Sequence, residues 1–249
     1  MALLDDVAGL RDRLGRLPRA RLAHLPTPLD DCPRIGDELG VSLRIKRDDC
    51  TGLAFGGNKV REHEFILGDA LAAGADCIVQ GAASQSNHSR QLAAAGAALG
   101  LAVHLVPRLD ARSEPVQGNY LIDHLLGARL HPIPADASSI QAKERVAAEL
   151  RTAGHTPYIV GMGSERAAAL AAVAYVGTAC EIVEADPRRV PSTVVVASQG
   201  STQIGLQLGF EQLGLPTRVI GINPLTEEHE AYLPPAEMLA MGRMCAQLL

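Results

Sequence analysis

The chain has 249 residues, 47% of them apolar, which is long enough for one large α/β domain or two interleaved ones. Its formal net charge is −5, only 3% of its residues are aromatic, and no Lys/Arg cluster stands out. This composition argues against a nucleic acid or another polyanion as a partner, because such partners require a basic face and often aromatic stacking platforms.

Targeting and cysteine patterns favour a cytoplasmic location without a membrane partner. No apolar run reaches the roughly 18 residues that a membrane span needs. Residues 1–17 carry acidic side chains early and lack the basic start and apolar core of a signal peptide. No C-x-x-C pair occurs, so we expect no metal site and no disulfide framework. The cysteines are scattered: Cys32, Cys50, Cys77, Cys180 and Cys245.

The hydrophobic pattern predicts strands that alternate with helices. Helices are expected at residues 3–17, 33–39, 59–73, 86–99, 118–126, 139–152, 167–185, 202–213 and 236–248, and strands at 41–46, 77–80, 101–106, 128–133, 157–160, 192–197 and 218–222. Such alternation is typical of an α/β fold with a mostly parallel sheet. Ligands bind in these sheets where a strand ends and a helix begins, and three turns of this kind carry polar residues or glycines.

The first candidate turn lies in TGLAFGGNK, residues 51–59. Gly56 and Gly57 remove side-chain bulk and permit left-handed backbone angles. Lys59 then begins a helix, near the positive end of its dipole and in a partly apolar setting, and both factors favour the neutral, nucleophilic amine. The pattern suits an imine-forming lysine, although an ordinary surface lysine after a flexible turn can have the same sequence pattern.

The second candidate turn lies in GAASQSNHSR, residues 81–90, where a strand leads through small and polar residues into a helix. Free N–H groups at the helix start, with the side chains of Ser86 and Asn87, suit a carboxylate such as that of an amino acid. Plain helix capping explains Ser and Asn equally well. A lone histidine such as His88 is more commonly a core or solvent-facing residue than a ligand.

The third candidate turn is SQGST, residues 198–202, between a valine-rich strand and a helix. This is the placement expected for a phosphate held by backbone N–H groups and hydroxyls. The turn matches neither the Walker pattern nor G-x-G-x-x-G, which disfavours a nucleotide-binding domain. A capped helix without a ligand is the alternative.

Taken together, the three turns resemble the motifs of one family. TGLAFGGNK resembles the lysine motif of the pyridoxal-phosphate-dependent D-cysteine desulfhydrases and 1-aminocyclopropane-1-carboxylate deaminases, QSNHSRQ resembles their Q-S-N-[HQ]-x-R-Q segment, and GSTQIG resembles the deaminase-type phosphate loop. The flanking LPTPL, IKRDD, QGNYLIDHLLGA and RVIGI agree, so the resemblance covers about residues 25–223. It implies pyridoxal 5'-phosphate (PLP) as the cofactor and the tryptophan synthase β-like fold (fold type II), with two open, mostly parallel twisted sheets flanked by helices.

The resemblance also implies site residues and a domain division. Lys59, beside Asn58, would hold the cofactor as a Schiff base and move a proton. Asn87 would bond the cofactor's phenolate oxygen, and Ser86, with His88 and nearby amides, would bind the substrate carboxylate. A small domain at residues 54–164 would be inserted into a large cofactor domain made of residues 1–53 and 165–249.

The phosphate would lie on Gly200, Ser201 and Thr202, but the sequence departs from the family pattern near this site. Where the family lysine motif usually continues T-R-K, with a second lysine that helps to neutralise the phosphate, this chain has Val60, Arg61 and Glu62. Glu62 is expected to weaken phosphate binding unless Arg61 or another cation compensates. Family members also continue with a C-terminal segment, carrying an active-site tyrosine, that has no equivalent here.

The resemblance implies a PLP-dependent lyase or deaminase acting on a small amino acid. We favour β-elimination of the D-cysteine desulfhydrase kind, which gives a 2-oxo acid and ammonia, because QSNHSRQ and QGNYLIDHLLGA point to that branch. GSTQ points instead to ring opening of the aminocyclopropane-carboxylate deaminase kind. A third interpretation is a catalytically degenerate relative that serves as a binding subunit. We expect a homodimer, or a partner that supplies the missing C-terminal part.

Overall fold

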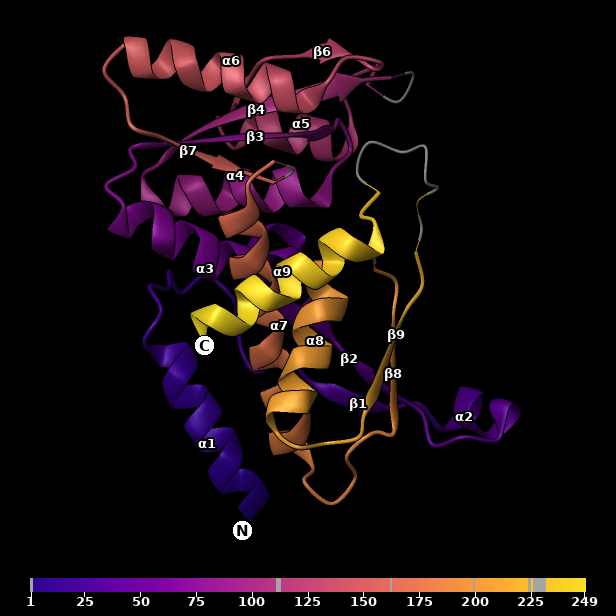
Figure 1. Cartoon of the computed structure of the whole chain (residues 1–249). Coiled ribbons are helices and arrows are strands. Elements are labelled where there is room, and N and C mark those ends of the chain that lie inside the picture. Colours follow the sequence, from indigo (N-terminus) through magenta and orange to yellow (C-terminus); the bar gives the residue numbers. More distant parts are fainter. Residues whose placement is uncertain (1, 111–112, 162, 199, 224, 226–231) are drawn as a thin grey trace.

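The computed structural model describes residues 2–110, 113–161, 163–198, 200–223, 225 and 232–249. Figure 1 shows an elongated molecule with a sheet-containing layer at one end and a helical body at the other. The α/β class and the parallel sheet predicted from the sequence are confirmed.

The sheet at one end of the molecule is parallel throughout, in the order β5-β4-β3-β7, with β6 beside β4. Its strands are β3 (Cys77–Ala83), β4 (Ala102–Leu109), β5 (Arg129–Leu130), β6 (Ile133–Pro134) and β7 (Pro157–Val160). The central strand β3 contains no charged residue and is almost wholly buried, as a parallel strand covered on both faces must be. The single strand expected at residues 128–133 is in fact two short strands that pair with different parts of β4.

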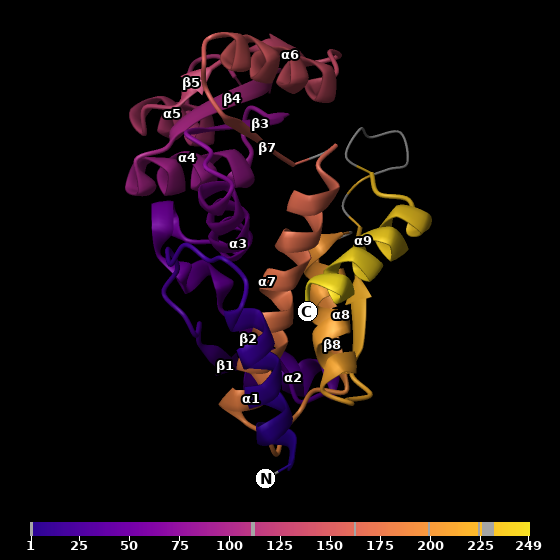
Figure 2. The ribbon, with the colours of Figure 1, turned by 60° about the vertical axis from the view of Figure 1, so that its left-hand side comes forward.

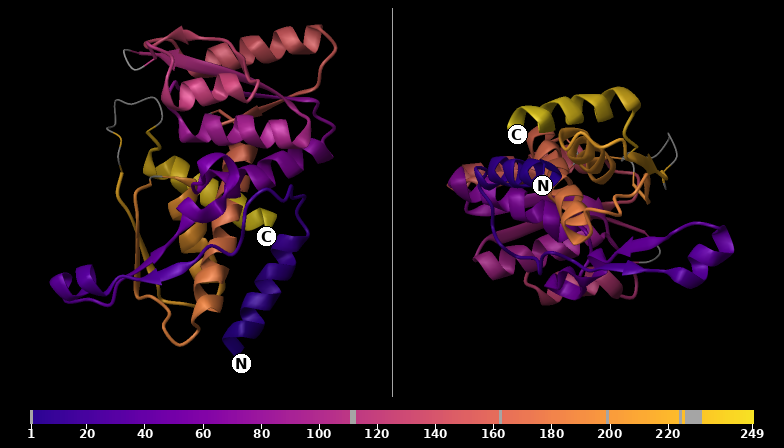
Figure 3. Two further views of the ribbon diagram at one scale, coloured as in Figure 1. Left: turned by 180° about the vertical axis from the view of Figure 1, so that it is seen from behind. Right: turned by 90° about the horizontal axis from the view of Figure 1, so that it is seen from below.

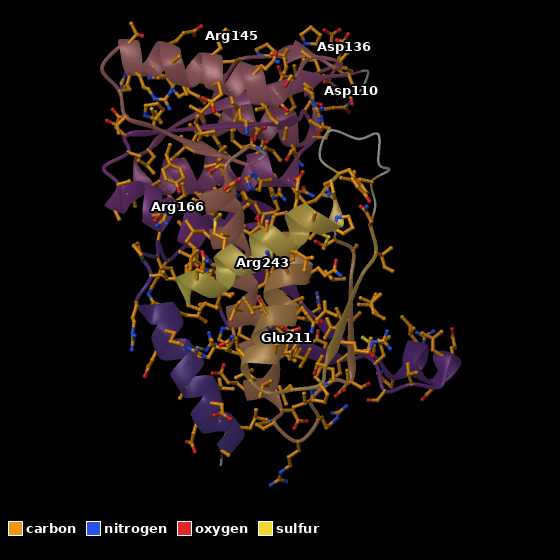
Figure 4. The ribbon with its side chains drawn as sticks, viewed as in Figure 1. Asp110, Asp136, Arg145, Arg166, Glu211 and Arg243 are labelled. Carbon is orange, nitrogen blue, oxygen red and sulfur yellow. The ribbon has the colours of Figure 1, made fainter. Side chains whose placement is uncertain are left out.

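Four helices surround this sheet: α3 (Lys59–Ala72), α4 (Asn87–Leu99), α5 (Gly118–Leu125) and α6 (Ser139–Thr152). In Figure 2, α6 covers one side of the sheet and α4 the other, with α3 beneath α4. The helix α3 also packs against the long helix of the body, so it connects the two ends of the molecule. Arg166, labelled in Figure 4, supports this junction because its Nε donates to Asp69 of α3 over 2.8 Å.

The helical body is built around α7 (Glu165–Ala185), against which α1 (Ala2–Gly15), α8 (Ser201–Gln212) and α9 (Pro235–Leu248) pack. By length and composition α7 is apolar enough to cross a membrane, contrary to our expectation from the sequence. However, 83% of its most apolar stretch is buried inside the protein. We therefore assign α7 to the core of the fold.

Two separate strand pairs flank the body. The strands β8 (Thr193–Val196) and β9 (Arg218–Gly221) are parallel, whereas β1 (Leu29–Asp31) and β2 (Arg44–Lys46) are antiparallel. Figure 3 shows the short helix α2 (Pro33–Leu39) at the tip of the β1–β2 pair, projecting away from the body. β1 was not expected, because its sequence LDD lacks an apolar alternation.

The proposed division into residues 54–164 and the remainder stays a prediction. The composition of the five-stranded sheet agrees with it, since every strand of that sheet comes from residues 77–160.

Candidate active site

The turn before Lys59 is rigid and requires both of its glycines. Gly56 and Gly57 have φ angles of 72° and 122°, in the region that side chains disfavour. A Cβ on Gly56 would lie 1.9 Å from a backbone oxygen, and one on Gly57 would lie 2.4 Å from the side chain of Gln91. The hydroxyl of Thr51 accepts from the N–H of Gly57 over 2.9 Å and donates to its carbonyl over 2.8 Å. The turn is thus fixed where it delivers Lys59 to the first position of α3.

Two residues just before this turn have unusual backbone angles. Ala54 and Phe55 have φ angles of 44° and 68°, which cost free energy for residues with a Cβ. The side chain of Phe55 is 82% exposed, so it does not supply the apolar setting that we expected around the lysine.

The amine of Lys59 lies against an acidic side chain. Its Nζ is 2.8 Å from Oε1 of Glu62, three residues further along α3. The Lys59 side chain is only 30% exposed, and that of Glu62 is 4% exposed. The surroundings of the amine are therefore polar and charged, which corrects the expectation of a partly apolar setting.

Arg61 does not compensate for Glu62. Its guanidinium points into a separate buried network, where it donates to both carboxylate oxygens of Asp48 and of Glu181, over 2.8–3.0 Å, and to the hydroxyl of Thr27. The Arg61 guanidinium is thus occupied by Asp48, Glu181 and Thr27. The structure therefore does not support the suggestion that Arg61 could neutralise a phosphate.

The second turn caps α4 and is tied to the first. Ser86 is the N-cap residue, and its Oγ accepts from the N–H of Ser89 over 3.2 Å, as the capping alternative requires. Asn87 is exposed, and its Oδ1 accepts from Arg90 over 3.2 Å and from Asn119 of α5 over 2.9 Å. Arg90 also reaches the carbonyl of Gly56. The start of α4 is therefore held beside the glycine turn and can still present its first N–H groups to a carboxylate.

His88 of α4 also lies beside Glu62. Its Nε2 lies 3.9 Å from Oε2 of Glu62, and its ring is edge-on to that of His63, with centroids 4.4 Å apart. Burial, followed by the charges of Lys59 and Lys143, lowers the pKa of His88 to about 3. The imidazole is therefore neutral at neutral pH. Its buried Nδ1 has no hydrogen-bond partner within the described part of the chain.

The third turn, at the start of α8, also lies beside Glu62. Gly200 has a φ of 141°, and among the described residues a Cβ there would meet only a methyl of Leu233, 3.7 Å away. Ser201 begins α8, and its Oγ donates to Oε1 of Glu62 over 3.1 Å. Asn58 donates to the buried Thr202 over 3.5 Å. Gln199, in the same turn, lies outside the described residues.

Tyr175 of α7 completes the arrangement. Its hydroxyl donates to Oε1 of Glu62 over 2.8 Å and accepts from Asn58 over 2.7 Å. Burial and the neighbouring Glu62 carboxylate raise the pKa of this phenol well above its usual value, so it stays protonated. The structure thus brings Lys59, Asn58, His88, Ser201 and Thr202 together around one carboxylate and one phenol. The sequence analysis did not assign Tyr175 to the site, nor Asn119, Arg90 and Gln91, which contact Asn87 and the carbonyl of Gly56 beside it.

Apart from Glu62, these residues fit a phosphorylated pyridoxal. A helix N-terminus preceded by glycine, with hydroxyls at its first two positions, is a suitable donor set for a phosphate. An amine and a further helix N-terminus lie near it. A cavity of about 200 Å³ elsewhere, between α4, β4 and the residues after α5, is lined by none of the candidate side chains.

Comparison with known proteins assigns the family. Residues 20–237 match the family described as "Pyridoxal-phosphate dependent enzyme". The chain is 39% identical over 217 residues to a D-cysteine desulfhydrase of Klebsiella pneumoniae, covering 84% of this chain and 65% of that protein. It is 37% identical over 211 residues to a Pyrococcus horikoshii protein provisionally named 1-aminocyclopropane-1-carboxylate deaminase, covering 84% of this chain and 63% of that protein.

A solved structure agrees with this assignment. The crystal structure of a homologue of 1-aminocyclopropane-1-carboxylate (ACC) deaminase superposes on this chain with a TM-score of 0.83 at 31% identity, covering 96% of this chain and 72% of that one. The chain therefore belongs to the PLP-dependent enzyme family, in the group that contains the desulfhydrases and deaminases, and has the fold type II architecture. It spans about 65% of the length of the curated relative that it matches.

Proposed function

We propose that the protein is a PLP-dependent lyase that eliminates sulfide from a small amino acid, as a D-cysteine desulfhydrase does, to leave a 2-oxo acid and ammonia. One observation carries the proposal. The amine of Lys59 and the hydroxyl of Ser201 both donate to the same oxygen of Glu62, over 2.8 and 3.1 Å. The amine of Lys59 and a helix N-terminus of the kind that binds phosphate therefore face one shared space.

The residues around this space have separable roles in the proposal. Lys59 would hold the aldehyde end of the cofactor and would move a proton at the α- or β-carbon of the amino acid. Ser201, Thr202 and the amide of Gly200 hold the phosphate. When bound, the cofactor supplies an electron-accepting pyridine ring that makes the amino-acid carbanion accessible.

The amino acid itself would be held at the start of α4. The first N–H groups of α4 and the hydroxyl of Ser86 bind its carboxylate, and Asn87, positioned by Asn119, bonds the phenolate oxygen of the cofactor. His88, neutral because of its lowered pKa, borders the same space and can exchange a hydrogen bond with the substrate.

Two alternatives share the same site. Ring opening of 1-aminocyclopropane-1-carboxylate would use the same lysine, and the similar identities to both kinds of relative, 39% and 37%, leave it as the runner-up. A catalytically degenerate relative is favoured by Glu62, whose carboxylate lies among the phosphate donors. We favour the desulfhydrase branch because of His88.

The cofactor part of the proposal is tested on the lysines. The chain has three, and Lys46 and Lys143 are engaged elsewhere, with Glu181 and with the carbonyl of Val160. Borohydride reduction of the PLP-loaded protein, followed by peptide mass analysis, is expected to place a pyridoxyl group on Lys59. Lys59→Arg abolishes the visible absorbance and the adduct, because a guanidinium cannot form the bond, and Lys46→Arg keeps both. An adduct on another lysine, or none, refutes the assignment.

The substrate part is tested by product analysis. We expect sulfide and ammonia from D-cysteine; ammonia from 1-aminocyclopropane-1-carboxylate alone would favour the deaminase branch. Release from neither would favour the degenerate relative.

Ser86→Ala should raise the KM for the amino acid, whereas Ser138→Ala, which removes the N-cap of α6, should not. The free energy of unfolding of each variant should fall by about 1 kcal/mol, because each loses a helix N-cap.

Assembly and location stay predictions. A homodimer, a partner that supplies further active-site residues, and a cytoplasmic location are expected from the family resemblance. Sedimentation of the purified chain tests the first of these.

A further inference from the structure

Glu62 is a buried carboxylate at the centre of a site whose other groups are mostly hydrogen-bond donors. Its Oε1 accepts from Lys59 over 2.8 Å, from Tyr175 over 2.8 Å and from Ser201 over 3.1 Å. Its Oε2 lies 3.9 Å from His88. With only 4% of its side chain exposed, the carboxylate depends on these donors, because a buried charge without partners is costly.

Glu62 engages two groups that the cofactor would use: the hydroxyl of Ser201, which would hold the phosphate, and the amine of Lys59, which would hold the aldehyde end. Ser201 is the first residue of α8, where the helix dipole and free N–H groups favour an anion. The hydroxyl of Ser201 is directed at Glu62 instead, and so is the amine of Lys59. A phosphate dianion at the start of α8 would meet a carboxylate within a few ångströms, and like charges in a water-poor site repel strongly. The two anions therefore exclude each other.

We propose that Glu62 is an internal competitor of the cofactor phosphate. Its carboxylate occupies the hydroxyl of Ser201, and it must turn away before a phosphorylated ligand is held. Glu62 thereby sets which form of the cofactor the site accepts, because an unphosphorylated pyridoxal meets less repulsion. The identity of the ligand rests on the proposed function, whereas the competition between anions does not.

The experiment compares two ligands on matched variants. Wild type, Glu62→Gln and Glu184→Gln are titrated with PLP and with pyridoxal, which lacks the phosphate, and binding is followed by visible absorbance. The glutamine of the first variant keeps the shape and one acceptor but removes the charge. Glu184 lies in the last turn of α7 and pairs with the partly exposed Arg11, so its variant controls for the loss of any acid. We expect Glu62→Gln to tighten PLP binding about tenfold or more and pyridoxal binding by less than about threefold. Glu184→Gln should change neither.

A second arm uses inorganic phosphate and does not depend on the cofactor. Phosphate should raise the thermal midpoint of Glu62→Gln and leave that of the wild type and of Glu184→Gln unchanged. Unchanged or weaker PLP binding by Glu62→Gln, or an equal gain for PLP and pyridoxal, overturns the inference. If no variant forms a PLP adduct, the proposed function fails, and the phosphate arm alone then decides whether Glu62 competes with anions. Should Glu62→Gln not fold, Glu62→Ala is compared in both arms in its place, with the same outcomes decisive.

Discussion

At the scale of single residues, the position of Lys59 depends on the neighbouring Arg61. The Arg61 side chain is 2% exposed and links α3 to Asp48 in the preceding segment and to Glu181 in α7. Lys46 adds a second contact to Glu181, at 2.7 Å. Because Lys59 lies two residues before Arg61, this network fixes the start of α3 and hence the direction of the amine.

Replacing Arg61 should therefore destabilise the protein strongly. Arg61→Met leaves the Asp48 and Glu181 carboxylates without their main counter-charge, and breaking a buried pair in this way costs about 3–5 kcal/mol. Arg47 also contacts two carboxylates, Asp30 and Asp49, but at the surface, so Arg47→Met should shift the unfolding midpoint far less. Urea unfolding of both variants measures the difference. Equal effects would mean that the buried network is not the source of the stability.

At the scale of elements, close contact between α7 and α8 positions the phosphate-type turn. A Cβ on Gly205 would lie 2.0 Å from the carbonyl oxygen of Ala172, and one on Gly209 would lie 2.6 Å from the Cβ of Ala179. Only residues without side chains allow α8 to lie so close to α7. The start of α8, with Ser201, is thereby carried to Tyr175 and Glu62.

The same substitution should act in opposite directions on two helices. Gly205→Ala overpacks the contact between α7 and α8 and should destabilise the protein by about 1–3 kcal/mol. Gly9→Ala in α1 places its Cβ in open space, so the helix propensity of alanine should stabilise the protein by up to about 1 kcal/mol. Thermal unfolding of the two variants checks both signs. A stabilising Gly205→Ala would show that the helices can separate at little cost.

At the scale of the whole molecule, buried histidines make stability depend on pH. Burial, followed by His131, lowers the pKa of His104 to about 4, burial lowers that of His88 to about 3, and burial holds the pKa of His63 well below its usual range. Unfolded histidines titrate near pH 6.5, so below that pH the unfolded chain binds more protons than the folded one. The stability that these groups contribute is thus complete above about pH 6.5 and is lost progressively as the pH falls towards 4.

The free energy of unfolding should accordingly fall between pH 7 and pH 5. His104→Asn should make that fall shallower, because the substituted residue binds no proton, whereas His124→Asn, at an exposed position of α5, should leave it as in the wild type. Denaturant titrations at several pH values measure the slopes. Identical slopes for all three proteins would contradict this account.

Much of this molecule follows from local sequence. The helices beginning at Lys59 and Ser201 and the cap at Ser86 lie within one residue of their predicted positions, because apolar periodicity and capping residues act over a few neighbours. The strand at residues 128–133 was less predictable. Its division into β5 and β6 is set by pairing with different parts of β4, which is a tertiary contact.

The sequence by itself determined the alternation of elements, the three polar turns and the family to which they belong, since these are written in neighbouring residues. Only the tertiary structure decided that Glu62, Tyr175 and Ser201, which are up to 139 positions apart, share one oxygen. The direction of a side chain at the centre of a site depends on how distant elements pack. No local pattern records that packing. The family resemblance therefore indicated that Glu62 lies near the phosphate site, whereas its hydrogen bonds from Tyr175 and Ser201 were not predicted.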